Sequence, residues 1–175
     1  MKEILQQQRA EGFPALYGSD IMIHLPIREA VLNDIVRVTA MRKGSIGPIK
    51  GLSIQLQSNN RLSIPLEISQ FPLPRQGRIE AVLAPFIDFQ KDPRLLLMLT
   101  PSGWLGMLIK LALPFVASDK KSIELSGNNL FFDLKAILVK AGATEYLPYI
   151  HSIGVRTEAG LLTLELHLHI QEKLT

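Results

Sequence analysis

The chain has 175 residues, of which 47% are hydrophobic and 6% aromatic, so it can bury the core of one domain built mainly from aliphatic side chains. Its formal charge of +3 is well below that of a typical nucleic-acid-binding domain, and the absence of cysteine excludes disulfides, zinc–thiolate sites and thiol catalysis. The first residues contain no apolar signal core, so export is not expected and the cytoplasm is the expected compartment.

The N-terminal part of the chain is expected to be a polar arm over residues 1–18, followed by a single domain over 19–175. Alternating apolar residues predict a short strand at 21–25. Pro26 follows, and because a helix does not need the N–H of its first residue, the sequence predicts an amphipathic helix over 26–39. Its apolar stripe would consist of Ile27, Ala30, Val31, Ile35 and Val38.

The clearest local pattern is a β-hairpin over residues 52–68. Apolar residues alternate with polar ones on both sides of Asn59 and Asn60, which tolerate the left-handed backbone of a tight turn. The apolar positions are Leu52, Ile54, Leu56, Leu62, Ile64, Leu66 and Ile68. Because Pro65 cannot donate a ladder hydrogen bond, the second strand is expected at a sheet edge or with a bulge.

The second half of the chain continues this strand-rich pattern. The expected strands are 78–89 (bent at Pro85), 94–100, 120–125, 152–156 and 161–171. Strand 94–100 has no alternation, which indicates that both of its faces are covered. Short helices are predicted over 104–113 and 133–141, and Asp133 suits the N-cap of the second one while Gly142 suits its C-cap.

The most apolar stretch of the chain, Leu95–Ala117, is long enough to cross a membrane but is interrupted. Pro101, Gly103 and Pro114 divide it into a strand and a helix of about 10 residues, which spans about 15 Å. We therefore expect a central strand and a core helix rather than a membrane span. The alternative is that the helix faces a cavity, a lipid or a partner, with Gly103, Gly106 and Lys110 on the side that faces it.

Catalytic signatures are mostly absent from the sequence. There is no nucleophile elbow, no HExxH zinc motif and no dinucleotide-binding glycine fingerprint. The loop Gly44–Gly51 lacks the lysine ending of a phosphate-binding loop, so a plain loop is favoured. Basic residues cluster near it without interleaved aromatics, which favours a solvated surface over a nucleic-acid site. These basic residues are Arg37, Arg42, Lys43 and Lys50.

Glu165, His167 and His169 are the best candidates for a polar site. Alternate residues of a strand point the same way, so two imidazoles could reach one metal ion if a third ligand came from His24 or His151. The competing interpretation is the solvent face of an amphipathic strand, and that interpretation is favoured. No cofactor is therefore expected.

Together the elements predict an α+β fold, with a curved, mostly antiparallel sheet of about six to eight strands packed on two or three helices. Amphipathic hairpins next to an apolar helix resemble those of the tubular lipid-binding superfamily. The resemblance rests on Leu52–Leu56, Leu62–Ile68, Ile123–Leu125 leading into Asp133–Leu138, and Leu162–Ile170. It implies a lipid bound by diffuse apolar contacts and transfers no individual site residue.

The expected function is therefore a non-enzymatic module that binds a lipid or another apolar ligand on the apolar face of its curved sheet. The expected ligand-binding residues are Trp104, Met107, Leu108, Leu111, Ile54 and Ile64. The alternative is an interaction or assembly module with a filled core, whose spare apolar face meets another copy or a partner chain. Contact with a membrane surface is left open, and nucleic acid is not an expected partner.

Overall fold

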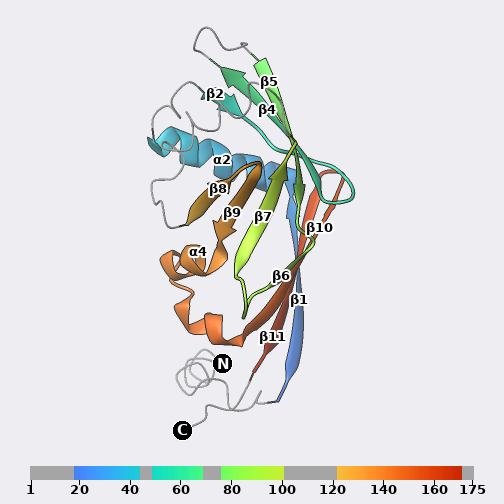
Figure 1. Ribbon diagram of the computed structural model, residues 1–175, viewed down its shortest axis with the longest axis vertical. Helices are drawn as coiled ribbons and strands as arrows, with labels where there is room; N and C mark the ends of the chain where they lie inside the picture. The colour runs from blue at the N-terminus through green and yellow to red at the C-terminus, as the bar shows by residue number, and fades with distance from the viewer. Residues whose placement is uncertain (1–17, 44–48, 69–75, 101–121, 171–175) are drawn as a thin grey trace.

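The computed structural model describes residues 18–43, 49–68, 76–100 and 122–170, and these form two antiparallel sheets with helices at their margins (Figure 1). The first sheet has four strands in the order β1-β11-β10-β6. Their bounds are Asp20–Arg28 for β1, Leu161–His169 for β11, Ile150–Glu158 for β10 and Phe86–Asp88 for β6. All its neighbouring strands are antiparallel, as the hairpin patterns predicted.

The second sheet has seven strands in the order β2-β4-β5-β7-β9-β8, with β3 paired to β4, and it curls into an open half-barrel. Its strands are β2 (Ile49–Leu52), β3 (Gln55–Leu56), β4 (Arg61–Ile68), β5 (Gln76–Leu83), β7 (Arg94–Leu99), β8 (Ile123–Ser126) and β9 (Asn129–Asp133). The helical elements of the described residues are α2 (Glu29–Lys43), α4 (Leu134–Lys140) and the 3-10 helix η2 (Thr144–Tyr149). No helix among the described residues is long and apolar enough to cross a membrane.

The buried core of the described residues is made by strands of both sheets rather than by helices. Leu66 of β4, Ala81 of β5 and Ile87 of β6 are 2–3% exposed. The helices add only half-buried side chains, such as Leu32 of α2 and Leu138 of α4. The predicted curved antiparallel sheet is therefore confirmed, whereas the expected packing of one sheet on helices is matched only loosely.

The hairpin predicted around Asn59 and Asn60 is confirmed. Both residues have positive φ, at 61° and 59°, as a tight turn that connects twisted antiparallel strands requires. Pro65 was expected to mark an edge strand or a bulge. The edge strand is wrong, because β4 pairs with β5 on one side and with β2 and β3 on the other, whereas the pairing of β4 with β2 does have a register shift, between Ile49 and Gly51. Pro65 lies opposite the break between β2 and β3, where the ladder is already interrupted.

The predicted helix start at Pro26 is also wrong, because β1 continues to Arg28 and α2 begins at Glu29. Every residue of β1, including Pro26, pairs with β11. The long ladder with β11 therefore overrides the local preference of proline for the first turn of a helix.

The face of α2 that packs inward differs from the predicted stripe. Val31, Ile35 and Val38 are 46–58% exposed. The inward contacts come instead from Leu32, which packs against the core, and from Asn33, whose side chain bonds both the N–H and the carbonyl of Ile54 at 2.7 and 2.9 Å. The inward face of α2 is thus marked by one leucine and by an amide that satisfies a strand backbone, rather than by the predicted stripe.

Pro85 lies where the chain passes from one sheet to the other. The expected single bent strand is two strands, with β5 in the seven-stranded sheet and β6 in the four-stranded sheet. The carbonyl of Pro85 accepts from Val155 of β10 at 2.8 Å, and the N–H of Ala84 donates to Leu96 of β7 at 2.9 Å. These bonds join the two sheets into one structure.

A second connection joins the tips of two hairpins that are far apart in the sequence. The side chain of Asn60 donates to the carbonyl of Val155 and accepts from the N–H of Thr157, both at 2.8 Å. The hydroxyl of Thr157, a residue that is 2% exposed, donates to the carbonyl of Gln57. The β3–β4 turn is thereby held against the end of β10, which fixes how the two sheets meet.

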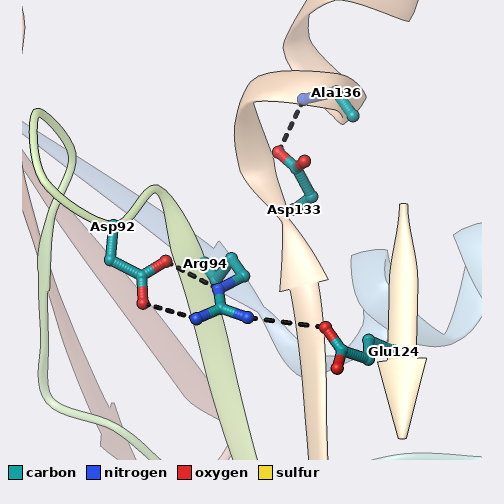
Figure 2. Close-up of polar contacts among 5 residues, drawn as sticks. All are labelled: Asp92, Arg94, Glu124, Asp133 and Ala136. Carbon is teal, nitrogen blue, oxygen red and sulfur yellow. Dashed lines mark hydrogen bonds and ion pairs between the residues drawn. The ribbon is translucent and has the colours of Figure 1, made fainter. Parts of the chain in front are cut away.

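Near the other end of the half-barrel, α4 begins at the end of β9 (Figure 2). The helix start at Asp133 was predicted, whereas the strand β9 before it was not. The carboxylate of Asp133 accepts from the N–H of Ala136 at 2.8 Å and caps the helix.

Beside this cap, Arg94 of β7 forms two bonds with Asp92, at 2.7 and 2.9 Å, and reaches Glu124 of β8 at 3.4 Å. The guanidinium of Arg94 thus connects strands on both sides of β9, and its hydrogen bonds hold the pKa of Asp92 below the ordinary value.

The helix predicted over 104–113 and the arm expected over residues 1–18, apart from Gly18, lie outside the described residues. Strand 94–100 is present as β7, but only one of its faces is closely covered. Leu97 and Leu99 are buried there, while Met98 on the opposite face is 40% exposed.

Candidate functional site on the four-stranded sheet

One face of the four-stranded sheet is continuously apolar. In the register of β1 with β11, Ile21 lies opposite Leu168, Ile23 opposite Leu166, Leu25 opposite Leu164 and Ile27 opposite Leu162. We call these eight side chains the apolar shelf. On the other side of β11, its leucines lie opposite Ile150, Ile153, Val155 and Thr157 of β10, so the apolar surface continues into the core.

Exposure increases steadily across this face towards β1. Ile153 and Val155 of β10 are only 6% and 4% exposed because they belong to the core that the two sheets share. The leucines of β11 are half-buried, while Ile23 and Leu25 of β1 are 37% and 43% exposed. Figure 1 shows β1 running along one outer side of the molecule. The apolar face therefore begins in the core at β10 and reaches the surface at the β1 side of the apolar shelf.

The opposite face of the same sheet carries all four histidines of the chain. His169 and His167 of β11 lie 2.7 and 3.5 Å from the carboxylate of Asp20 on β1, and His24 lies 3.7 Å from Glu165. The ring of His151 packs edge-on against that of His167, with 5.5 Å between centroids.

The carboxylate of Asp20 contacts two of the four histidines on this polar face, His167 and His169. Its hydrogen bond with His169 is the main cause that lowers the pKa of Asp20 below 3.8, with smaller contributions from the charges of His169 and His167. Asp20 therefore stays ionised throughout the neutral and mildly acidic range. The group is exposed, so its interactions are screened by solvent.

The predicted polar residues are therefore on one face, as expected, but they do not form one site. Glu165 contacts His24, whereas His167 and His169 contact Asp20. Within the described ranges, no three histidine, aspartate or glutamate side chains are grouped so that they could hold a metal ion.

Two of the pockets lined by described residues are open, and the lining of each mixes polar and apolar residues. One, of about 640 Å³, lies between Gly51 and Arg78 at the ends of β2, β4 and β5. The other, of about 530 Å³, lies beside the Asn60–Thr157 connection. Neither of these two pockets is an apolar tunnel, whereas the apolar shelf consists of aliphatic side chains alone.

Most of the expected ligand-binding residues lie outside the described residues, so the expected site stays a prediction. Trp104, Met107, Leu108 and Leu111 lie outside the described residues, as do Gly103, Gly106 and Lys110. Ile54 and Ile64 are half-buried and pack against the core of the seven-stranded sheet, so their role in binding stays a prediction.

Sequence reasoning missed the β1 half of the apolar shelf. The signal was present as the alternation of Ile21, Ile23 and Leu25, but the adjacent Pro26 suggested that the strand ends at residue 25. Only the register with β11 shows that this strand is long and that its apolar side chains reach the surface.

Comparison with known proteins adds no further constraint: no protein-family model matches the chain, and no curated protein or solved structure matches it significantly.

Proposed function

We propose that this protein is a non-enzymatic binding module that holds an apolar ligand, with a lipid acyl chain as the ligand class, on the apolar shelf. The observation that carries the proposal is the exposed aliphatic surface of β1 and β11, which continues into the core. An exposed apolar surface that is this continuous is typical of a binding site. A lipid ligand also agrees with the resemblance of the hairpins to those of the tubular lipid-binding superfamily.

The dimensions of the shelf suit one acyl chain. From Ile21 to Ile27 the strand advances six residues, which at about 3.4 Å per residue gives a length of about 20 Å. One leaflet of a bilayer has about 15 Å of hydrocarbon, so a single extended chain fits along β1 and β11. The side chains on offer are aliphatic, so recognition would depend on shape and burial.

The expected gain in free energy is adequate for reversible binding. A chain that buries about 300 Å² of apolar surface gains about 7 kcal/mol before the entropy costs of association. Individual shelf residues contribute part of this, because fully burying a leucine side chain contributes about 1.5–3 kcal/mol. One charged substitution in the shelf is therefore expected to weaken binding roughly tenfold or more.

The test uses a pair of variants on the same strand. Leu25→Asp places a carboxylate on the apolar shelf, whereas Met22→Asp places one on the opposite face of β1, where Met22 is 59% exposed. Binding of a fluorescent long-chain fatty acid is measured for the wild type and both variants, together with native mass spectrometry of the freshly purified protein.

We expect Leu25→Asp to weaken fatty-acid binding roughly tenfold or more and Met22→Asp to leave it near the wild-type value. Equal affinities for the two variants would place the ligand elsewhere. A wild type that binds no fatty acid in solution and carries no co-purified apolar molecule would refute the proposal.

A further inference from the structure

The outer edge of β1 has backbone groups that β11 does not use. The N–H of Glu29 donates to Gly160 at 2.9 Å, and Ser19 accepts from Ile170 at 3.1 Å. In an antiparallel ladder such bonded positions recur at every second residue. The odd-numbered residues of β1 therefore bond to β11, and the N–H and carbonyl groups of its even-numbered residues point away from it.

Pro26 agrees with this assignment. It is even-numbered, so its missing N–H falls on the outer edge, and all nine positions of β1 keep their β11 partners. Among the described residues, nothing pairs with this outer edge. Seven of the nine residues of β1 are exposed, which makes it a long apolar edge strand. Such edges are templates for pairing with another strand.

The sequence of β1 is complementary to itself in one antiparallel register. When His24 lies on a twofold axis, Asp20 of one copy lies opposite Arg28 of the other, in bonded pairs on the polar face. On the apolar face, Ile23 lies opposite Leu25 and Ile21 opposite Ile27. Opposite charges and aliphatic pairs at facing positions both stabilise neighbouring antiparallel strands.

Registers centred on Ile23 or on Met22 lose this complementarity. With Ile23 on the axis, Asp20 would face Pro26 instead of Arg28, so the pairing of opposite charges would be lost. With Met22 on the axis, Arg28 would extend beyond the paired segment. In the His24-centred register, Pro26 of one copy faces Met22 of the other. Because proline has no backbone N–H, each half of the interface lacks one hydrogen bond, the one that the carbonyl of Met22 would accept.

We propose that two copies of this chain pair through β1, antiparallel and centred on His24, to form one continuous eight-stranded sheet from their four-stranded sheets. The pairing uses the strand edge and leaves the apolar faces of the two sheets side by side. It does not rest on the proposed ligand, since a dimer can form whether or not the shelf is occupied.

The decisive experiment exchanges charges between the two ends of β1. In an Asp20→Lys homodimer the introduced lysine would face Arg28, and in an Arg28→Asp homodimer the introduced aspartate would face Asp20, so both carry like charges. A mixture of the two variants forms a heterodimer in which both facing pairs have opposite charges. Analytical ultracentrifugation at a series of dilutions, with circular dichroism to confirm folding, measures each association.

The wild type is expected to dimerise, and each single variant to dimerise roughly tenfold to a hundredfold more weakly. Their equimolar mixture is expected to recover most of the wild-type affinity. His24→Pro, which removes an outward N–H without affecting a β11 bond, is expected to be monomeric at concentrations where the wild type is a dimer. A monomeric wild type, single variants that dimerise as well as the wild type, or a mixture that stays monomeric would each overturn the proposal.

Discussion

The connection between the two hairpin tips gives the sharpest test of how the sheets are joined. Asn60→Gly keeps the left-handed turn, because glycine adopts positive φ readily, but removes the side chain that bonds Val155 and Thr157. Both backbone partners belong to residues that are at most 4% exposed, so water cannot easily replace the lost bonds.

The expected cost follows from these two bonds. At about 0.5–1.5 kcal/mol each, their loss costs about 1–3 kcal/mol, and relief of the left-handed backbone in glycine offsets part of it. A net loss of about 1–2 kcal/mol corresponds to a decrease in Tm of about 2–8 °C for a domain of this size. Thermal and urea unfolding, followed by circular dichroism, measure the change.

Asn59→Gly is the matched control. Asn59 has the same left-handed backbone in the same turn, but its side chain is exposed and is not part of the connection. We expect this variant to unfold within about 0.5 kcal/mol of the wild type or slightly above it. If Asn60→Gly and Asn59→Gly destabilised the protein equally, the effect of Asn60 would come from the turn and not from the connection between the hairpin tips.

Three further expectations concern the sheet face and the helices. Asp20→Asn should lower the free energy of unfolding at neutral pH, because a carboxylate with a lowered pKa in the folded state stabilises that state only while it is ionised. The difference from wild type should disappear as the pH falls through the lowered pKa of Asp20, and urea titrations over a range of pH measure it. Asp133→Ala should cost about 1 kcal/mol in thermal unfolding, because the N–H of Ala136 loses its cap. Leu32→Ala should lower the free energy of unfolding in urea by about 1–2 kcal/mol, and Val31→Ala by less than about 0.5 kcal/mol. A larger loss for Val31→Ala would show that α2 packs by its predicted stripe.

Local patterns predicted the hairpins well because their information lies within a few residues. Asn59 and Asn60 between two alternating segments determine a turn and two strand faces, and Asp133 determines a helix start by bonding a residue three positions away. The register of the final hairpin follows in the same way from its alternating leucines and the turn at Gly160, whose φ is +77°.

The features that the sequence did not predict depend on partners far along the chain. Whether Pro26 begins a helix or continues a strand is decided by β11, about 140 residues away, whose ladder extends to Arg28. The division into two sheets depends on the crossing at Pro85 and on the bonds of Asn60 to β10. The candidate site could not be predicted for the same reason. The exposure of Ile23 and Leu25 depends on how far β1 extends beyond the core that the two sheets share.

The most direct test of the central claim, an apolar ligand on the shelf, is methyl NMR with a spin-labelled fatty acid. A ligand on the shelf should selectively broaden the methyl signals of Ile23, Leu25 and Leu166. The methyls of Ile137 and Val139, which are 39% and 46% exposed on α4, should stay sharp and report non-specific contact. Equal broadening of all exposed methyls, or none at saturating fatty acid, would contradict the claim.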